Sequence, residues 1–342
     1  MTDYKEAGVN LAEADKAVSR IGELAAETYT KDVVAGVGGF SGLFSAKSLK
    51  QFKEPVLVSS IDGVGTKVKV ARAMNYFRGL GIDVVNHCSN DVGVTGAKPL
   101  FFLDYIASSR LDAKVVAELV GGMAYACKKI GVSLIGGETA EMPSVYNENE
   151  SDVVGVMVGA VERSEILDGS KVKEGDVLVG LPSNGLHTNG FSLARKVLLE
   201  DAGMDPKAFV EGLGLSLGEE LLRPHISYVG QIALAKEKHS LKAAAHITGG
   251  GFQGNIPRVL PKGFGAEIEK QRVPVQPIFR LIQEKGNIAE EEMFRTFNMG
   301  IGLVMVVPEK NAQSLANEIR AEFKKAPEII GKVIKGHGVT FK

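Results

Sequence analysis

The sequence predicts a two-domain α+β protein. Its 342 residues are more than twice a common domain length, which makes two domains the first expectation. A composition of 44% hydrophobic and 24% charged residues is that of a globular protein with a large core. Strand-like apolar runs and helical patterns are also mixed along the chain. We place the boundary in the polar, turn-rich stretch 162–175, which gives domains 1–168 and 169–342.

Charge and cysteine usage exclude several classes of protein. With 40 basic and 41 acidic residues, the chain offers no electrostatic reason for a nucleic-acid or membrane partner. Cys88 and Cys127 form neither a metal motif nor a disulfide framework, which favours a reducing compartment. The first ten residues lack the features of a secretory signal, and the apolar runs are shorter than the roughly 20 residues that span a bilayer. We therefore predict a cytoplasmic protein.

The first helix is predicted within residues 1–30, where Asp15, Val18, Ile21 and Leu24 have near-helical spacing. The glycine-rich stretch 35–42, AGVGGFSG, is unsuited to helix or strand. Its backbone amides are able to close over phosphate groups. A mobile surface loop is the alternative for this stretch taken alone.

Residues 55–67, PVLVSSIDGVGTK, read as a buried strand followed by a polar turn. Asp62 suits Mg2+, Gly63 allows backbone amides to approach phosphate oxygens, and Thr66 and Lys67 add a hydroxyl and a positive charge. This set suits a phosphorylated ligand with a divalent cation. A hairpin turn with an incidental lysine explains the stretch equally well if it is considered alone.

Two helices are predicted next, over 68–80 and 81–96. Asn86, Asn90 and Asp91 can share one face of the second helix, where polar groups are costly to bury. A ligand or a metal explains them, and so do bonds to backbone or water.

A strand over 99–107 contains Asp104, whose side chain we expect to point away from its apolar neighbours, toward solvent, a partner or a site. A helix follows over 111–130, with Gly131 as its C-cap. The strand over 132–135 is then expected to end in the polar string 136–143, GGETAEMP, which contains Glu138. A strand over 152–161 closes the first domain.

The second domain begins with a strand over 176–181 and the polar string 182–190, followed by a helix over 191–199. His187 and Asn189 in that string either act on a substrate or cap the helix, and we favour the substrate. A helix over 224–238 contains His225, to which, as to His239 and His337, we assign no catalytic role.

A strand over 243–247 leads into three glycines, 249–251, that packing alone does not readily explain. The remaining elements are two helices around Ile278 and Met293, a strand over 300–307, a helix over 309–323 and a strand over 329–334. The chain contains no Walker motif, Rossmann fingerprint, nucleophile elbow or zinc spacing. The residues alone therefore indicate a two-domain enzyme that handles a phosphorylated ligand, with Mg2+.

A series of long motifs gives the chain a specific resemblance. They are DGVGTK (62–67), NDVGVTGAKPLFFLDYIA (90–107), GGETAEMP (136–143), NGLHTNGFSLAR (184–195), HITGGG (246–251), NIPRVLP (255–261) and FNMGIGL (297–303). In order and spacing, from about Tyr4 to the C-terminus, this series resembles the phosphoribosylformylglycinamidine cyclo-ligases, or aminoimidazole ribonucleotide synthetases. The resemblance implies ATP-dependent ring closure of formylglycinamidine ribonucleotide in purine biosynthesis. It also implies an AIR-synthetase-like fold: a homodimer whose N-terminal mixed α/β domains form a barrel, with ATP near the interface, and a C-terminal α/β sandwich-like domain.

With this resemblance, we assign candidate roles to individual residues. ATP is expected at Gly38, Gly39, Asp62, Gly63, Thr66, Lys67 and Asp91, with Asp62 and Asp91 also binding Mg2+. The substrate is expected at Thr188, Asn189 and Gly249, Gly250 and Gly251. Catalytic roles are expected for His187 or His246, as proton carriers, and for Glu138, which joins the metal or organises the substrate.

Two departures from the family pattern affect these assignments. Gly254 stands where we expect a glutamate, and residues 22–29 contain no lysine for ATP. The alternatives are related ATP-using enzymes of the selenophosphate synthetase or thiamine-monophosphate kinase type, and a catalytically silent nucleotide-binding scaffold. Residues 35–42 contain no cysteine of the kind we expect in a selenophosphate synthetase. A thiamine-phosphate kinase would leave the strings at 184–195 and 246–251 unexplained.

Overall fold

The computed structural model describes the chain from Leu11 to Lys342 and forms two compact units. The first unit runs up to Val92 and includes Lys98–Arg163, and the second comprises Gly93–Ala97 and Ser164–Lys342. The predicted absence of a signal in the first ten residues lies outside the described residues. Between Leu11 and Lys342, no helix combines the length and apolar character that crossing a membrane requires.

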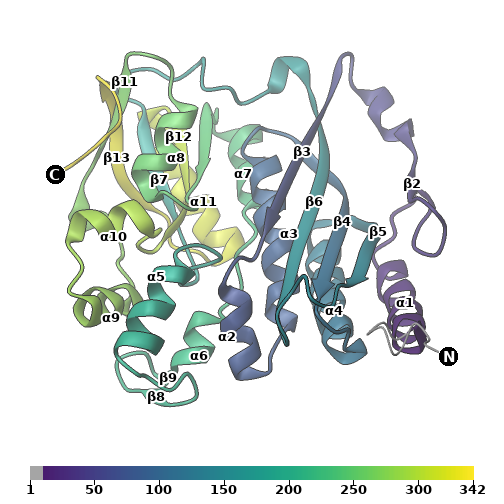
Figure 1. Cartoon of the computed structure of the whole chain (residues 1–342). Coiled ribbons are helices and arrows are strands. Elements are labelled where there is room, and N and C mark those ends of the chain that lie inside the picture. Colours follow the sequence, from purple (N-terminus) through teal and green to yellow (C-terminus); the bar gives the residue numbers. More distant parts are fainter. Residues whose placement is uncertain (1–10) are drawn as a thin grey trace. The chain divides into compact units, whose positions relative to one another are not determined.

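The first unit is built on a four-stranded sheet with the order β3-β6-β4-β5 (Figure 1). Its strands are β3 (Pro55–Gly63), β6 (Ser151–Glu162), β4 (Lys98–Ser108) and β5 (Ser133–Glu141). The central strand β6 is antiparallel to both neighbours, whereas β4 and β5 are parallel. The short strands β1 (Val33–Ala35) and β2 (Leu43–Phe44) pair with each other and precede η1 (Ala46–Gln51).

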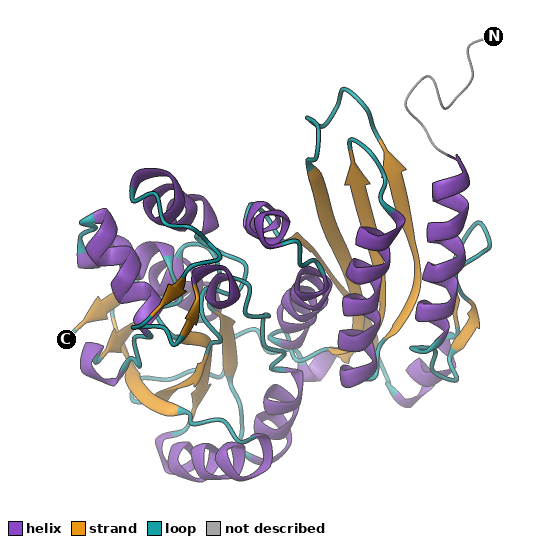
Figure 2. Ribbon diagram, turned by 90° about the horizontal axis from the view of Figure 1, so that it is seen from below, coloured by secondary structure: helices purple, strands orange, loops and turns teal. Residues whose placement is uncertain are grey.

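The two faces of this sheet differ, because successive side chains of a strand point to opposite sides. On one face, Phe102 and Met157 are fully buried, and the sheet lies so close to a helix that a Cβ at Gly155 would lie 2.9 Å from Val84. On the other face, the side chains of Leu57 and Ile61 are 63% and 69% exposed. Figure 2 shows the long strands of this sheet with the helices alongside. One face is therefore core and the other is an apolar surface.

The helices of the first unit are α1 (Leu11–Ala26), α2 (Lys67–Met74), α3 (Arg78–Gly93) and α4 (Ala113–Ile130). The predicted boundary between the second and third helices was wrong, because α2 ends at Met74, where the C-cap residue Asn75 adopts the left-handed conformation with φ 50°. The Asp112 side chain caps α4 by accepting hydrogen bonds from the amides of Lys114 and Val115. Gly131, with φ 70°, ends α4 as predicted.

Strand β5 differs from the prediction, since it continues through most of the polar string 136–143 to Glu141. Parallel pairing with β4 extends the strand along this whole stretch. Gly137 lies beside Asp104, and a Cβ at Gly137 would lie 2.3 Å from Asp104 Oδ1. Asp104 itself is buried. Its side chain lies on the opposite face from Leu103 and Tyr105, as predicted, but the expectation that it could point to solvent was wrong.

Burial raises the pKa of Asp104 to about 7, even though a hydrogen bond with its own backbone acts in the opposite direction. The unfolded chain releases this proton near pH 4 and the folded chain near pH 7. We therefore expect the free energy of unfolding to fall by an amount on the order of 4 kcal/mol as the pH rises across that window. Chemical denaturation between pH 4 and 8 measures this slope, which Asp104→Asn should remove. The exposed Glu148→Gln serves as the control, and an unchanged slope in Asp104→Asn would contradict the expectation.

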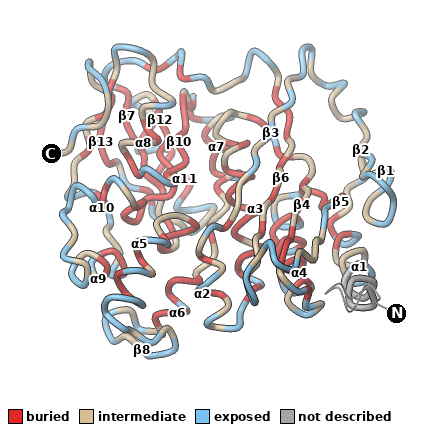
Figure 3. Tube along the Cα trace, in the orientation of Figure 1, coloured by how far each residue is buried: buried red, intermediate tan, exposed pale blue. Residues whose placement is uncertain are grey.

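The second unit contains a six-stranded sheet with the order β10-β12-β7-β13-β11-β14. Its strands are β10 (Ala243–His246), β12 (Ile301–Val307), β7 (Val177–Pro182), β13 (Glu328–Lys335), β11 (Phe264–Ile268) and β14 (Val339–Phe341). The strands pair antiparallel except for β11 and β14. Leu303, Met305 and Val179 pack with Leu315 and Ile319 of α11 in the hydrophobic core. Figure 3 shows that β7, β12 and β10 are buried.

The helices of the second unit support the strings that the sequence singles out. They are α5 (Phe191–Arg195), α6 (Leu217–Leu221), α7 (Val229–Lys238), α8 (Gly251–Asn255), α9 (Pro277–Gly286), α10 (Glu290–Thr296) and α11 (Glu309–Phe323). The helix predicted over 191–199 is α5 continued by a π-helix, Lys196–Asp201, and the helix predicted from residue 224 begins only at Val229. Strands β11 and β14 and the small pair β8 (Phe209–Val210) and β9 (Leu215–Ser216) were not predicted.

Candidate functional site

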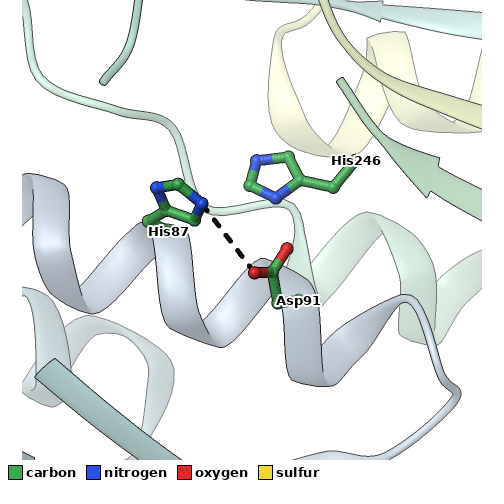
Figure 4. A group of neighbouring side chains, drawn as sticks. All are labelled: His87, Asp91 and His246. Atoms are coloured by element: carbon green, nitrogen blue, oxygen red, sulfur yellow. Dashed lines mark ion pairs between the residues drawn. The ribbon is translucent and has the colours of Figure 1, made fainter. Parts of the chain in front are cut away.

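The first unit brings two predicted carboxylates to one histidine. Asp62 lies at the end of β3, and α3 carries His87 and Asp91 one turn apart (Figure 4). His87 Nε2 is 3.0 Å from Asp62 Oδ2 and 3.8 Å from Asp91 Oδ2. The Ser60 hydroxyl donates a 3.3 Å hydrogen bond to Asp91, and the Gly63 amide donates one of 2.8 Å to Asp62. Asp62 and Asp91, predicted from separate motifs, therefore share one cluster.

The electrostatics of this cluster favour charged groups. Burial opposes the ionisation of Asp62, but the hydrogen bond and charge of His87 outweigh it, so the pKa of Asp62 lies below its ordinary value. For His87, burial favours the neutral ring, but the hydrogen bond to Asp62 and the nearby carboxylates raise its pKa. The side chains of Asp62 and Asp91 remain 41% and 32% exposed, whereas that of His87 is buried. The carboxylate oxygens thus stay accessible while the buried His87 ring contacts them.

Lys67 has a different environment from the one predicted. Its ammonium lies 2.7 Å from Asp83 Oδ2, and both side chains are 0% exposed. Burial lowers the pKa of Lys67, and the charge of Asp83 and its hydrogen bond oppose that change. The ion pair joins the start of α2 to the middle of α3, where His87 and Asp91 also lie. Contact with ATP phosphates stays a prediction, and it would require the buried ammonium to become accessible.

The structure does not bring Glu138 or the Gly38–Gly39 turn together with Asp62. Glu138 is exposed on β5, which is separated from β3 by two strands, or roughly 14 Å at the usual strand spacing. The β1–β2 segment that contains Gly38 and Gly39 also contacts β5. Within one chain, the candidate ATP residues therefore lie at opposite edges of the sheet.

The second unit holds the string 183–190 in one conformation through a network of side-chain bonds. Gln276 donates to Ser183 O at 2.8 Å and accepts from the Gly185 amide at 2.9 Å. The Asn184 amide donates a 2.9 Å hydrogen bond to His187 Nε2. His187 has a left-handed φ of 62°, which this bond helps to hold. Because Nε2 is an acceptor here, the hydrogen of the neutral His187 ring is on Nδ1.

A cluster of three buried histidines lies beside this string. The rings of His187 and His225 stack with centroids 4.0 Å apart, and His225 Nε2 lies 2.9 Å from His246 Nε2. Thr188 Oγ1 is 3.4 Å from His225 Nδ1. All three rings are at most 5% exposed. The structure thus joins the two predicted catalytic histidines through His225, to which the sequence assigns no role.

The glycine turn 249–251 follows His246 directly and lies against Asn189. A Cβ at Gly249 would lie 3.2 Å from Asn189 Oδ1. The Asn255 side chain donates hydrogen bonds to the carbonyls of Gly251 and Gly249, at 2.8 and 3.2 Å. The predicted substrate residues Thr188, Asn189 and the three glycines are therefore neighbours in one unit.

Packing accounts for one of these glycines, contrary to the expectation from the sequence. Gly251 has φ 56°, and a Cβ there would lie 2.0 Å from Phe294 O. Gly263 has φ 88°, and a Cβ there would meet nothing within 4 Å. We expect Gly263→Ala to lower the free energy of unfolding by about 1–2 kcal/mol through backbone strain alone. Gly251→Ala should cost distinctly more because it adds the clash, and urea denaturation of both variants measures the difference. Equal losses would contradict this interpretation.

Sequence reasoning missed His87, Asp83 and His225. For His87 and Asp83 a signal existed. His87 lies four residues before Asp91 and Asp83 four residues before His87, so the three side chains can share one face of the helix. His225 follows Pro224 in a stretch without glycines, so local sequence carried no sign of its contact with His246.

The sequence is similar to known proteins over both units. Residues 48–161 match the family described as AIR synthase related protein, N-terminal domain, and residues 173–342 match AIR synthase related protein, C-terminal domain. The chain therefore belongs to the AIR synthase related proteins.

Curated relatives define the family more narrowly. A phosphoribosylformylglycinamidine cyclo-ligase from Bacillus cytotoxicus is 49% identical over 338 residues, which cover 99% of this chain and 97% of the relative. One from Thermoanaerobacter pseudethanolicus is 47% identical over 336 residues, covering 98% of both chains. The chain is a member of the phosphoribosylformylglycinamidine cyclo-ligase family, which is a family of enzymes. The predicted family, enzyme class and two-domain AIR-synthetase-like fold are confirmed.

Solved structures share the fold at low sequence identity. Thiamine-monophosphate kinase from Stenotrophomonas maltophilia has a TM-score of 0.72 and 16% identity, covering 96% of both chains. The hydrogenase maturation protein HypE in complex with ATP has a TM-score of 0.66 and 15% identity, covering 93% of this chain and 88% of that one. The alternative that this chain is itself a thiamine-monophosphate kinase or selenophosphate synthetase is not supported, since relatives near half identity are named cyclo-ligases.

Proposed function

We propose that this protein closes the imidazole ring of formylglycinamidine ribonucleotide, using ATP and giving 5-aminoimidazole ribonucleotide, ADP and phosphate. The observation that carries this proposal is the identity of 49% with a named cyclo-ligase along almost the whole chain. The reaction belongs to purine biosynthesis, and we place it in the cytoplasm.

The reaction requires the protein to position ATP and the substrate and to neutralise phosphate charge, more than to provide covalent catalysis. ATP phosphorylates the formyl oxygen of the substrate, which converts that oxygen into part of a phosphate leaving group. The amidine-side nitrogen then attacks the same carbon, the ring closes, and the phosphate departs with the oxygen. One proton leaves the attacking nitrogen, and His246 or His187 is its proposed acceptor. His187 would accept it at Nε2, which requires release of the bond from the Asn184 backbone amide.

Asp62 and Asp91 are the proposed Mg2+ ligands. Their carboxylates are partly exposed and both contact His87. The Ser60 hydroxyl donates to Asp91 and the Gly63 amide donates to Asp62. Hard divalent cations prefer such oxygen donors. Bound Mg2+ would neutralise the charge on the phosphates of ATP. His87 would then keep both carboxylates oriented from the buried side. The related HypE structure that contains ATP supports nucleotide binding by this fold.

The substrate's ribose phosphate is proposed to bind at the second unit. The glycine turn 249–251 lies against Asn189, and the backbone amides of Gly249 and Gly250 are the proposed donors to phosphate oxygens. The Gly251 amide, also expected there, instead donates to Thr248 O at 3.1 Å. Thr188 would contribute its hydroxyl from the adjacent string. The proposed functional division is an ATP-binding and dimerisation domain, 1–168, and a C-terminal domain, 169–342.

We further propose a homodimer formed through the exposed face of the four-stranded sheet. Leu57 and Ile61 on β3 are the most exposed apolar side chains of that sheet. Gly38, Gly39 and Glu138 lie at the edge opposite to Asp62, so a second copy offers a way to complete one ATP site. Sedimentation of Ile61→Glu tests this, and a wild-type monomer would overturn it.

One assay tests the activity. Purified protein with Mg-ATP should release ADP and form aminoimidazole ribonucleotide in equal amounts, and only when formylglycinamidine ribonucleotide is present. Omitting Mg2+ should stop both. ATP turnover without ring closure, or no turnover with any of these reagents, would overturn the proposed function.

A further inference from the structure

The string 183–190 has an unusual backbone conformation outside any helix or strand. It lies between β7, which ends at Pro182, and α5, which begins at Phe191. Gly185 and His187 have left-handed φ angles of 78° and 62°. For a residue with a Cβ, such as His187, this conformation is unfavourable and persists only where the surroundings hold it. The string therefore depends on partners elsewhere in the second unit.

Two side-chain amides from distant segments are these partners. Gln276, at the N-terminal end of α9, donates to Ser183 O at 2.8 Å and accepts from the Gly185 amide at 2.9 Å. Asn298, which lies between α10 and β12, donates to Gly185 O at 3.0 Å and accepts from the Gly300 amide at 2.9 Å. We call Gln276 and Asn298 the amide clamp.

The backbone groups at the amide clamp fix the orientation of both side chains. A backbone N–H only donates and a carbonyl oxygen only accepts, so the Gln276 oxygen faces the Gly185 amide and its nitrogen faces Ser183 O. The same reasoning orients Asn298 between the Gly300 amide and Gly185 O. Gly185 is buried, so loss of Gln276 would leave its N–H without an acceptor, which is costly. The string should then leave this conformation.

We propose that Gln276 and Asn298 are positioning residues of the substrate site. They act through the string, which they hold in the conformation that places Asn189 against the glycine turn 249–251. A Cβ at Gly249 would lie 3.2 Å from Asn189 Oδ1. The string is thus ordered before the ligand arrives, so binding does not have to order it. This inference rests on the proposed binding of the substrate's ribose phosphate at that turn.

Hydrogen exchange of the string tests the amide clamp independently of activity. Gln276→Met removes both bonds at similar side-chain length, and the Gly185 amide of this variant should exchange at least about tenfold faster than in the wild type. Gln276→Glu keeps an oxygen for that amide and loses the donor to Ser183 O, so its rate should lie between the two. Gln283→Met is the matched control, because Gln283 lies in the same helix and donates to Ile288 O at 3.3 Å. Thermal unfolding verifies that each variant is folded.

Substrate binding gives a readout that a purely structural role would not change. In Gln276→Met, the KM for formylglycinamidine ribonucleotide should rise at least about tenfold while kcat stays within about twofold, because only the ordering of the string is lost. Titration calorimetry with the ribonucleotide in the absence of ATP should show the same weakening of Kd. Asn298→Asp keeps the acceptor for the Gly300 amide and loses the donor to Gly185 O, and it should raise KM in the same way. Gln283→Met should match the wild type.

The outcomes separate this inference from the proposed function. Unchanged exchange of the Gly185 amide in a folded Gln276→Met overturns the amide clamp. Faster exchange with unchanged KM and Kd overturns its role at the substrate site. A wild type that neither binds nor converts the ribonucleotide overturns the proposed function and the substrate role together, whereas the exchange rates still decide whether the amide clamp holds the string.

Discussion

Replacing Lys67 with methionine is expected to lower the free energy of unfolding by about 3–5 kcal/mol. The substitution leaves the Asp83 carboxylate, with 0% exposure, without its 2.7 Å cationic partner. Its charge cannot be hydrated in the folded protein, so the folded state loses stability while the unfolded state does not. Urea denaturation followed by circular dichroism measures the effect.

A double variant and a neighbouring lysine sharpen this test. Lys67→Met combined with Asp83→Leu removes both buried charges and should be less destabilised than Lys67→Met alone. Lys69→Met removes an exposed lysine whose partner is Glu150, at 3.2 Å, and should cost about 1 kcal/mol or less. If Lys67→Met and Lys69→Met proved equally stable, the buried pair would have no structural role.

The largest expected loss of activity follows from Asp62→Asn. We expect kcat/KM to fall by at least about 10- to 100-fold, with the loss greatest when Mg2+ is limiting, since the variant removes a proposed metal ligand and the main anionic partner of His87. Asp91→Asn should behave in the same way. ADP release titrated with Mg2+ gives the measurement.

Folding should survive this substitution, because the Asp62 side chain is 41% exposed and its bond to the Gly63 amide can be made by asparagine. Asp201→Asn, which removes an exposed carboxylate paired with Lys196, is the control and should keep full activity. Normal turnover of Asp62→Asn at limiting Mg2+ would remove the metal role from that residue.

Elements with strong local signals could be predicted from the sequence. The helix ending at Gly131 and the strands β3, β6 and β12 were found near their observed bounds because apolar periodicity and a glycine cap are local properties. Strand β5 was cut short, because its second half is polar and glycine-rich and only its pairing with β4 makes it a strand. The strand β14 is likewise held by its partner β11.

The same difference between local signals and tertiary contacts applies to the candidate site. The motifs identified Asp62, Asp91, His187 and His246, whose residue types suggest chemistry in any context. They could not identify partners defined by tertiary contact, such as Asp83 at Lys67 or His225 at His246. For the same reason Lys67 was expected at a ligand and was found buried.

The five residues Gly93–Ala97 belong to the second unit although the chain then returns to the first. The Leu167 amide donates to Thr95 O at 2.9 Å, and Lys236 Nζ donates to Gly96 O at 3.0 Å. During synthesis these five residues emerge from the ribosome long before Leu167 and Lys236 are translated, so their hydrogen bonds form late. The strands on either side of them, β3 and β4, can pair with β6 before that. A fragment that stops at Arg163 would keep this segment permanently without its partners, so a cut between the two family domains does not yield two self-sufficient proteins.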